Sequence, residues 1–502
     1  MKTIKFKYLF IVTALISLGS CSEEFVDITP KGSFLSDNYY ADETQATAAL
    51  VGVYDIIRKN SGSFENMIAV MNAGSDDHYA GGGSATDGEG IQAFSKHTLT
   101  SINVLRPFWT DHYQGIFRAN TLLVKLPNVA MSNNLKDRFA AEAKALRAIY
   151  YFNLVRIFKN VPLLLDPLTA TNMYDVEQAA PEAVYAQIEK DLLEAIPVLP
   201  ISVPVATDGG RLTKGAAQAM LGKVYLYNGK KAEAAAVLAE VNGTPGATNQ
   251  YGNKLLPNYN DLWVFSNKFN AESLLEVSHT NASNADWWFW GSGMDEGNTL
   301  NVMVGVRNYS RTSGSTAADL APGWSFDVIT QDLYDAIKSD PRFGATIFDM
   351  KAIKAAGQAD YVAGYQDTGY FLNKFMPRNS DKTTGGGAVE INYQQNSYVI
   401  RLADTYLMEA EALGSGARAQ ALLDAVRARV GLPSVPVTLA AIKNERRMEL
   451  AGEGHRFFDL VRWGDAATKL ADRGFVAGRD EIWPIPTSEP VSYTHLTLPT
   501  KA

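Results

Sequence analysis

Apolar residues recur every three or four positions along most of this chain, which predicts a mainly helical protein. The pattern is clear in residues 41–58, where the apolar side chains stand at positions 46, 49, 50, 53, 56 and 57. This spacing places them on one face of a helix. The same pattern predicts helices over residues 108–126, 135–158, 182–196, 212–227, 231–241, 402–413, 417–430 and 439–451.

Three of these predicted helices carry a leucine followed four positions later by a tyrosine. The pairs are Leu146 with Tyr150, Leu221 with Tyr225, and Leu402 with Tyr406. The middle pair continues with Gly222, Ala234, Leu238 and Val241, which is the spacing of a tetratricopeptide unit. General antiparallel helix packing is the alternative. Both interpretations predict a scaffold that is partly solenoid-like.

Two regions interrupt the helical pattern. Residues 72–103 are rich in glycine and aspartate and show no clear period, which predicts one long loop. Residues 242–397 are rich in glycine, asparagine, serine and aromatics, which predicts a large irregular insertion. We expect a short helix at 332–338 and small strands near 273–279 and 398–401. Insertions on one face of a solenoid often build its binding surface.

The N-terminus has the layout of a secretory signal, with lysines at positions 2, 5 and 7 and an apolar run over 8–18. That run is too short to span a bilayer as a helix. Leu-Gly-Ser before Cys21 resembles the lipobox of bacterial lipoproteins. We therefore interpret residues 1–20 as a signal peptide and Cys21 as a lipidated first residue that anchors the chain to a membrane. A plain secretory signal with an unmodified cysteine is the alternative.

Composition narrows the possible chemistry. The chain has 502 residues, is 46% hydrophobic and carries a formal net charge of −8. An acidic chain without long basic runs argues against a nucleic-acid partner. Cys21 is the single cysteine, so its acylation leaves no thiol for a disulfide, a cysteine-ligated metal or a nucleophile. A chain of this length can bury a core large enough to be stable without them.

One segment near the C-terminus identifies a family. Residues 444–464, NERRMELAGEGHRFFDLVRWG, resemble the C-terminal signature of the SusD/RagB family of Bacteroidetes outer-membrane lipoproteins. Residues 142–152, 211–217, 401–412 and 483–486 agree with the family in the same order. The resemblance extends from about Cys21 to Pro486. Residues 491–502 do not fit and resemble translated adapter sequence, so we interpret 487–502 as a non-native tail.

The resemblance implies a lipid-anchored, non-catalytic binding protein on the cell surface. Such proteins cover a SusC-like TonB-dependent outer-membrane transporter and capture an oligosaccharide for import. The implied fold is one SusD-like domain, in which tetratricopeptide units face the transporter and loops on another face bind ligand. Its expected parts are residues 21–241, an insertion at 242–397, and C-terminal helices at 398–486. No cofactor, metal or nucleic acid is implied, and a peptide cargo, as in RagB-like members, stays open.

Tryptophans in the insertion are the strongest candidates for ligand contact. Trp287, Trp288 and Trp290 lie within four residues, beside a glycine-rich stretch. Sugars bind by stacking their C–H faces on aromatic rings while polar groups fix their orientation. A helix or strand would send these indoles to different faces, and burial of all three would require partners for their N–H groups. We expect at least one to be exposed, although core positions for most of them are an alternative.

Other candidates come from the same family expectation. The resemblance places the loop with Asp77 and Tyr79, and the stretch with Asn103, near the ligand. Tyr309 and Arg311 in the insertion are weaker candidates. Structural roles for these residues are equally open. Residues 87–90, Asp-Gly-Glu-Gly, contain acidic oxygens suited to calcium but lack the EF-hand spacing, which favours a solvated loop.

Two more features are interpreted as structural. Trp109 begins a helix with apolar residues at helical spacing, which predicts a core position. Charged residues over 445–462 alternate with large apolar ones, which predicts salt bridges that hold the last helices in place.

Two other classes of protein remain as alternatives. A secreted glycosidase requires two facing carboxylates, and Asp76 and Asp77 are sequence neighbours, which does not supply that geometry. The chain has no His-Glu-x-x-His or Gly-x-Ser-x-Gly motif. A tetratricopeptide adaptor that binds only protein would not need the long aromatic insertion.

Overall fold

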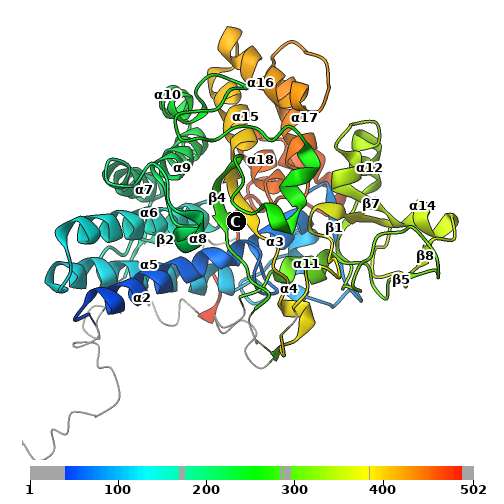
Figure 1. Cartoon of the computed structure of the whole chain (residues 1–502), viewed down its shortest axis with the longest axis horizontal. Coiled ribbons are helices and arrows are strands. Elements are labelled where there is room, and N and C mark those ends of the chain that lie inside the picture. Colours follow the sequence, from blue (N-terminus) through cyan, green and yellow to red (C-terminus); the bar gives the residue numbers. More distant parts are fainter. Residues whose placement is uncertain (1–39, 169–175, 283–285, 288–295, 384, 489–502) are drawn as a thin grey trace, which may run out of the picture.

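The computed structural model describes residues 40–168, 176–282, 286–287, 296–383 and 385–488. Cys21, the predicted signal peptide and the predicted non-native tail lie outside these ranges. Figure 1 shows long helices stacked from α2 at the lower left to α16 at the top, with short strands and short helices gathered on the right. The expected mainly helical fold with a tetratricopeptide-like scaffold and an irregular insertion is confirmed.

Successive long helices of the scaffold pack against one another, as α5 does on α6, α9 on α10 and α15 on α16. Their bounds agree closely with the predicted helices, except that one more lies at residues 456–463, where no helix is predicted. They are α2 Glu43–Tyr54, α5 Pro107–Lys125, α6 Asn133–Phe158, α7 Pro181–Ala195, α9 Lys214–Tyr227, α10 Lys231–Asn242, α15 Leu402–Leu413, α16 Ala417–Arg429, α17 Leu439–Glu449 and α18 Arg456–Trp463.

Local capping explains where several of these helices begin. The side chains of Ser132, Thr213 and Thr438 accept hydrogen bonds from backbone N–H groups in the first turns of α6, α9 and α17. Such caps satisfy donors that have no partner within the helix. Pro181 opens α7, where its missing N–H costs nothing. The scaffold boundaries are therefore set mostly by short-range sequence signals.

Gly222 shows why the tetratricopeptide spacing matters. A Cβ atom at Gly222 in α9 would lie 2.4 Å from Cγ of Leu238 in α10. The missing side chain therefore lets the two helices approach closely. Trp109, at the start of α5, is 2% exposed, which confirms its predicted place in the core.

The strands form short antiparallel pairs, of which β1, β5, β7 and β8 are labelled on the right of Figure 1, and β2 and β4 nearer its left and centre. The pairs are β1 (His78–Gly81) with β6 (Phe326–Ile329), β2 (Val161–Pro162) with β3 (Gln178–Ala179), β4 (Ser273–Val277) with β10 (Ser397–Arg401), β5 (Ser310–Arg311) with β8 (Ala359–Asp360), and β7 (Ile347–Asp349) with β9 (Tyr370–Leu372). β4 and β10 confirm the two strands expected in the insertion.

Short helices accompany these strands. They are α3 Met67–Ala73, α4 Glu89–Ser95, α8 Val205–Asp208, α11 Thr299–Val304, α12 Gln331–Ile337, α13 Phe343–Thr346, α14 Met350–Ala355 and α19 Ala466–Lys469. The prediction of one long loop over residues 72–103 is therefore wrong in part, because this stretch contains β1 and α4. β1 forms by pairing with β6 far along the chain, and local periodicity does not report such pairing.

A buried group of paired charges joins the C-terminal signature to the rest of the fold. We call it the central charge network. Its ion pairs are Arg401 with Glu272 at 2.8 Å, with Glu449 at 2.6 Å and with Glu453 at 2.8 Å, Arg342 with Glu445 at 2.7 Å and with Glu449 at 2.9 Å, Lys374 with Glu453 at 2.8 Å, and Arg429 with Glu272 at 2.9 Å and with Glu449. The interpretation of residues 445–462 as structural salt bridges is confirmed.

Glu449 shows how strongly this network favours ionised carboxylates. Burial alone would raise the pKa of Glu449, but the charges of Arg429, Arg401 and Arg342 outweigh it and hold the pKa well below its ordinary value. The pKa of Glu453 is likewise lowered, since Arg401 and Lys374 overcome the effect of burial. The folded state therefore requires these carboxylates to remain charged.

Substitution Glu449→Gln should destabilise the protein by about 3–5 kcal/mol, because it leaves buried guanidinium groups short of negative charge. The free energy of unfolding from denaturant titration measures this effect. Glu43→Gln is the matched control, since Glu43 lies exposed in the first turn of α2 and its change should stay within about 0.5 kcal/mol.

The pH dependence of the free energy of unfolding gives a second measurement in the same experiment. The contribution of Glu449 is present above the unfolded-state pKa of about 4.3 and is lost as pH falls through the lowered pKa of the folded state. Wild type should therefore lose stability more steeply below about pH 5 than Glu449→Gln does. Equal acid slopes, or a neutral loss under about 1 kcal/mol, would contradict the proposed role of the network.

Gly222→Ala should destabilise the protein by about 1–3 kcal/mol, because the added methyl collides with Leu238. Gly52→Ala in α2 is the matched control. Its Cβ would come no closer than 4.0 Å to Arg118, so the gain in helix propensity should stabilise by about 0.5–1 kcal/mol. Thermal unfolding of both variants measures the contrast, and a stabilising Gly222→Ala would refute close approach of the two helices.

Candidate functional site

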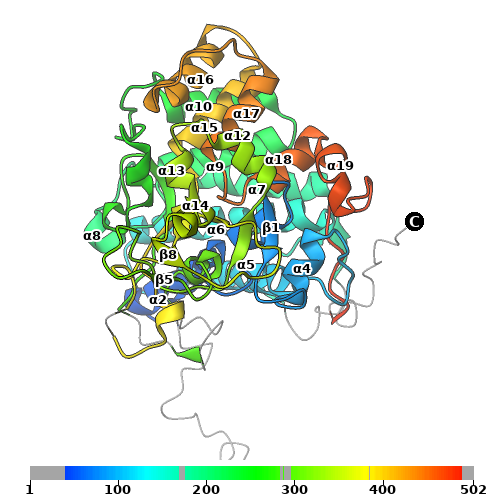
Figure 2. The same ribbon diagram turned by 90° about the vertical axis from the view of Figure 1, so that its right-hand side faces the viewer.

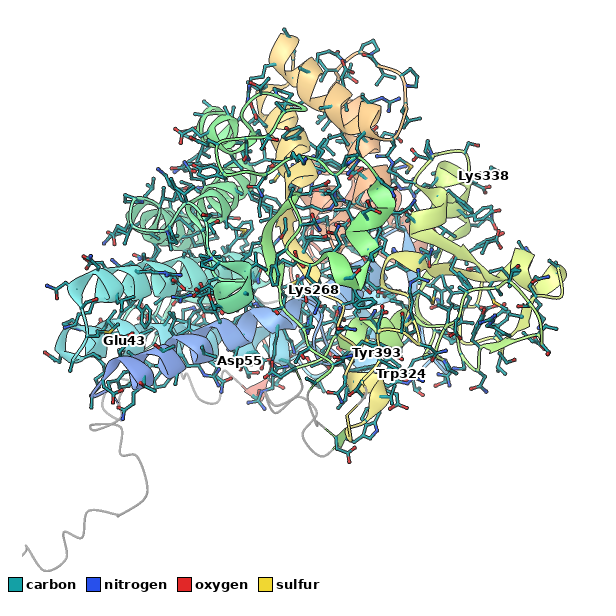
Figure 3. All side chains as sticks on the ribbon, in the orientation of Figure 1. Glu43, Asp55, Lys268, Trp324, Lys338 and Tyr393 are labelled. Carbon is teal, nitrogen blue, oxygen red and sulfur yellow. The ribbon has the colours of Figure 1, made fainter. Side chains whose placement is uncertain are left out.

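Four aromatic residues form a continuous row where the insertion meets β1. The ring centroids of Trp287 and Trp324 lie 6.0 Å apart with their planes 30° apart. Phe64 lies 6.1 Å from Trp324 and 5.2 Å from Phe326. We call Trp287, Trp324, Phe64 and Phe326 the aromatic row. Figure 3 labels Trp324 beside Tyr393 in the lower right part of the molecule.

The aromatic row runs from solvent into the core. Trp287 is 43% exposed, Trp324 and Phe64 are half-buried, and Phe326 is buried. The buried end fixes the row to the protein while the outer end presents an indole to solvent. The exposure of at least one of the insertion tryptophans is thus confirmed for Trp287, whereas Trp288 and Trp290 lie outside the described residues.

The backbone around Phe326 is held in an unusual conformation. Ser325 and Asp327, on either side of it, have φ values of 59° and 55°, in the left-handed region that residues other than glycine rarely adopt. The N–H of Gly82 donates to the carbonyl oxygen of Ser325 at 2.7 Å, which ties this strained segment to the end of β1. Strain of this kind concentrates at functional sites.

The carboxyl group of Asp327, the residue after Phe326 in β6, is buried. Burial raises its pKa well above the ordinary value, and the hydrogen bond from the Asn72 amide, 3.2 Å long, offsets this only in part. The uncharged acid is therefore favoured.

Asp87 and Arg307 form a polar edge beside Trp324. An Nη2 atom of Arg307 lies 3.8 Å from Oδ2 of Asp87 and donates to the carbonyl oxygen of Trp324 at 3.3 Å. Both side chains are about one-third exposed, at 31% and 37%. The N–H of Gly83 donates to Asp87 at 2.7 Å. A guanidinium and a carboxylate are thus held beside the backbone of Trp324.

Glycines are required for this close arrangement. A Cβ atom at Gly82 would lie 2.8 Å from the ring of Phe326, and one at Gly83 would lie 2.8 Å from Nη2 of Arg307. The glycine-rich stretch therefore allows the backbone to approach the row and the polar edge. Because an exposed indole next to orienting polar groups can stack a sugar ring and hydrogen-bond its hydroxyls, the site has the chemistry of carbohydrate recognition.

The structure brings only part of the predicted site together. Asp77 is 1% exposed, and its Oδ1 accepts a hydrogen bond from Nε of Arg447 at 2.8 Å. Tyr79 is half-buried in β1, with the guanidinium of Arg473 4.2 Å from its ring centre. The buried ion pair favours a structural role for Asp77 over the expected ligand contact, because a ligand would have to displace Arg447.

The remaining candidates also have structural partners. Oδ1 of Asn103 accepts from the N–H and hydroxyl of Thr100, which caps a local turn. Tyr309 is 5% exposed, packs in a separate small core with Phe348 and donates its hydroxyl to a backbone carbonyl. Arg311 is exposed in β5, 3.6 Å from Asp319. The burial of Tyr309 argues against the expected contact with ligand.

Sequence reasoning missed Trp324, Phe64, Asp87 and Arg307 as members of the site. They come from separate segments, and no periodic pattern connects them to Trp287. The glycine-rich stretch was the single sequence feature that pointed to this site. It indicates that the backbone there approaches another segment closely, but it does not indicate which segment. The sequence favours a solvated loop at Asp87 over a calcium site; in the structure Asp87 accepts from a backbone N–H and faces Arg307.

The described part of the chain lacks both a group of metal-ligating side chains and a membrane-spanning helix. No group of three or more histidine, cysteine, aspartate or glutamate side chains there is arranged to hold a metal ion. No helix within it has the length and apolar character needed to cross a bilayer.

Comparison with known proteins agrees with this architecture. Residues 307–481 match the SusD family model, and residues 36–226 match a model described as starch-binding associating with outer membrane. A SusD-like protein from Bacteroides ovatus is 26% identical over 92% of this chain and 83% of its own length.

Solved structures give closer matches. A laminarin-binding SusD-like protein is 61% identical, with a TM-score of 0.90 over 92% of this chain and 100% of that one. Surface glycan-binding protein A from Bacteroides thetaiotaomicron, in complex with laminarihexaose, is 23% identical with a TM-score of 0.80 over 91% of this chain and 99% of its own, which supports the fold. No enzyme family is indicated. The identity over the full length of the laminarin-binding relative, together with both family models, shows that this chain belongs to the SusD/RagB family.

Proposed function

We propose that this protein binds a glycan at the cell surface and delivers it, without cleavage, to a SusC-like TonB-dependent transporter in the outer membrane. The observation that carries the proposal is the exposed Trp287, which stacks on Trp324, while the backbone carbonyl of Trp324 accepts from Arg307, which lies beside Asp87. Trp287 would stack on the C–H face of a sugar ring. The polar edge would hydrogen-bond the hydroxyls that project from that ring.

The proposed cargo is a glucan of the laminarin type. The 61% identical relative is named for laminarin binding, and its full length is covered by this chain. The relative solved with laminarihexaose has the same fold. A peptide cargo would need different recognition, chiefly backbone amide pairing, and is an alternative outcome of the test below.

We propose binding without turnover because the polar groups at the row do not match those of a glycosidase. A glycosidase places two carboxyl groups on opposite sides of the bond that it cleaves. Asp87 instead lies 3.8 Å from the guanidinium of Arg307 and accepts from the N–H of Gly83. The proposed role of Asp87 is therefore to orient a hydroxyl group.

Trp287→Ala should weaken laminarin binding by roughly tenfold to thirtyfold, the loss typical of a dominant aromatic contact. Isothermal titration calorimetry with laminarin and laminari-oligosaccharides measures the affinity, and chromatography of the mixture tests for released sugar. Phe117→Ala is the matched control, since Phe117 is a 49% exposed aromatic on the scaffold helix α5. Unchanged affinity in Trp287→Ala would contradict the proposed site, and product release would contradict binding without cleavage.

The proposed anchor is the lipid on Cys21. In a Bacteroidetes host, Cys21→Ser should move the protein from the outer-membrane fraction to the soluble fraction, because the acylated thiol is replaced by a hydroxyl. Immunoblots of fractionated cells measure the distribution, with Ser22→Ala as the neighbouring control. A membrane-bound Cys21→Ser protein would show that another feature holds it at the membrane.

A further inference from the structure

A second cavity lies apart from the aromatic row. Its volume is about 290 Å³, and it is enclosed by residues 260–265, by α13 and by residues 373–381. Figure 2 labels α13 among the segments that surround this part of the molecule. Trp263, Val264 and Phe265 supply an apolar wall, and polar side chains from the opposite segment complete the lining.

The apolar wall is rigidly supported. The ring of Trp263 packs edge-on against Phe375 at 5.6 Å and Tyr398 at 5.9 Å, and Nζ of Lys374 lies 4.6 Å from its centre. On the facing side, the Asn373 amide donates to the carbonyl oxygen of Gly344 at 2.7 Å. A cavity whose walls are already ordered binds with little loss of conformational entropy.

Two charged side chains in the cavity retain unused hydrogen-bonding capacity. Asp381 is 2% exposed and accepts from the Ser380 hydroxyl, yet within the described ranges it has no cation within 4 Å. Arg378 donates from Nη2 to Asn373 at 3.3 Å, and the described residues provide no partner for its other N–H groups. Burial raises the pKa of Asp381, which is the expected cost of leaving such a group without a strong partner.

We propose that this cavity is a second glycan subsite, which holds a neutral sugar ring of the same chain that stacks on Trp287. The apolar face of the ring would lie on Val264 and Phe265, beside the nearly buried Trp263, while Asp381 would accept and Arg378 and Asn373 would donate hydrogen bonds to hydroxyls. The opposite charges of Asp381 and Arg378 balance, which suits a neutral ring better than a uronate or sulfate. The volume is at the small end of ligand pockets, which suits one or two rings.

The cavity and the aromatic row share a backbone segment. The carbonyl oxygen of Pro377 accepts from the N–H of Ala321, at 2.8 Å, in the segment that leads to Trp324. The hydroxyl of Thr383 donates to the carbonyl oxygen of Asn281, at 2.6 Å, in the segment that leads toward Trp287. Residues 377–383 therefore line the cavity and also hold both segments of the row. A long glucan that engages both places would gain affinity through effective concentration, whereas a short one would not.

This inference rests on the proposed function, and its test uses the full-length protein with laminarin and with laminaritriose. Val264→Trp should fill the mouth of the cavity without disturbing the core, because Val264 is 46% exposed. Val476→Trp is the matched control, since Val476 is 47% exposed outside the cavity lining. Val264→Trp should lower the affinity for laminarin by about tenfold through the loss of bivalent binding, while Val476→Trp should match wild type.

A second arm isolates the cavity. In the Trp287→Ala background, saturation-transfer NMR should still detect weak binding of laminaritriose, and Val264→Trp or Asp381→Ala should abolish that signal. If wild type binds laminarin and none of these variants changes affinity or the residual signal, the second subsite is refuted while the proposed function stands. If wild type fails to bind laminarin, the proposed cargo and the second subsite are both overturned.

Discussion

The fold depends on the need to pair charges once they are buried. Arg401 and Glu449, each at most 1% exposed at the side chain, meet in the centre of the central charge network. Removing one partner of such a pair leaves an uncompensated charge in a medium that solvates it poorly. The network draws its members from α16 and α17, from the segment after α17, from the last residue of β10, from the residue before β4 and from the insertion through Arg342 and Lys374. It therefore fixes where the irregular insertion sits on the helical scaffold.

The same signature also positions the aromatic row. The Asn72 amide donates to the carbonyl oxygen of Gly452 at 3.0 Å and to Asp327 at 3.2 Å, and its oxygen accepts from the N–H of Gly454 at 3.0 Å. One buried asparagine thus links the glycines that follow α17 to the strand that carries Phe326. Through these bonds the buried end of the row, at Phe326, is connected to the segment that follows α17. Such order before binding lowers the entropic cost of holding a ligand.

Aromatic content by itself did not reveal the site. Trp109, Trp263 and Trp483 are buried, and they pack edge-on against other rings. Trp287 differs because it is presented at the surface by the insertion, next to groups that can hydrogen-bond sugar hydroxyls. Most aromatic residues in this chain therefore stabilise the interfaces between helices and strands, and recognition is left to the few that the insertion exposes.

Local sequence patterns were enough to infer the scaffold helices and their caps, because helix periodicity and capping act over a few residues. Local patterns also indicated that residues 445–462 form structural salt bridges. The exposure of Trp287 could be expected from its setting. The partners of Trp287 could not, since Trp324, Arg307 and Asp87 meet through the pairing of two four-residue strands, β1 and β6, far apart in the sequence. The opposite holds for Asp77 and Tyr309. The sequence suggests that both side chains could contact ligand, but both are buried in the folded protein. Short strands gain their stability from distant neighbours, so only the folded chain decides which side chains reach the site.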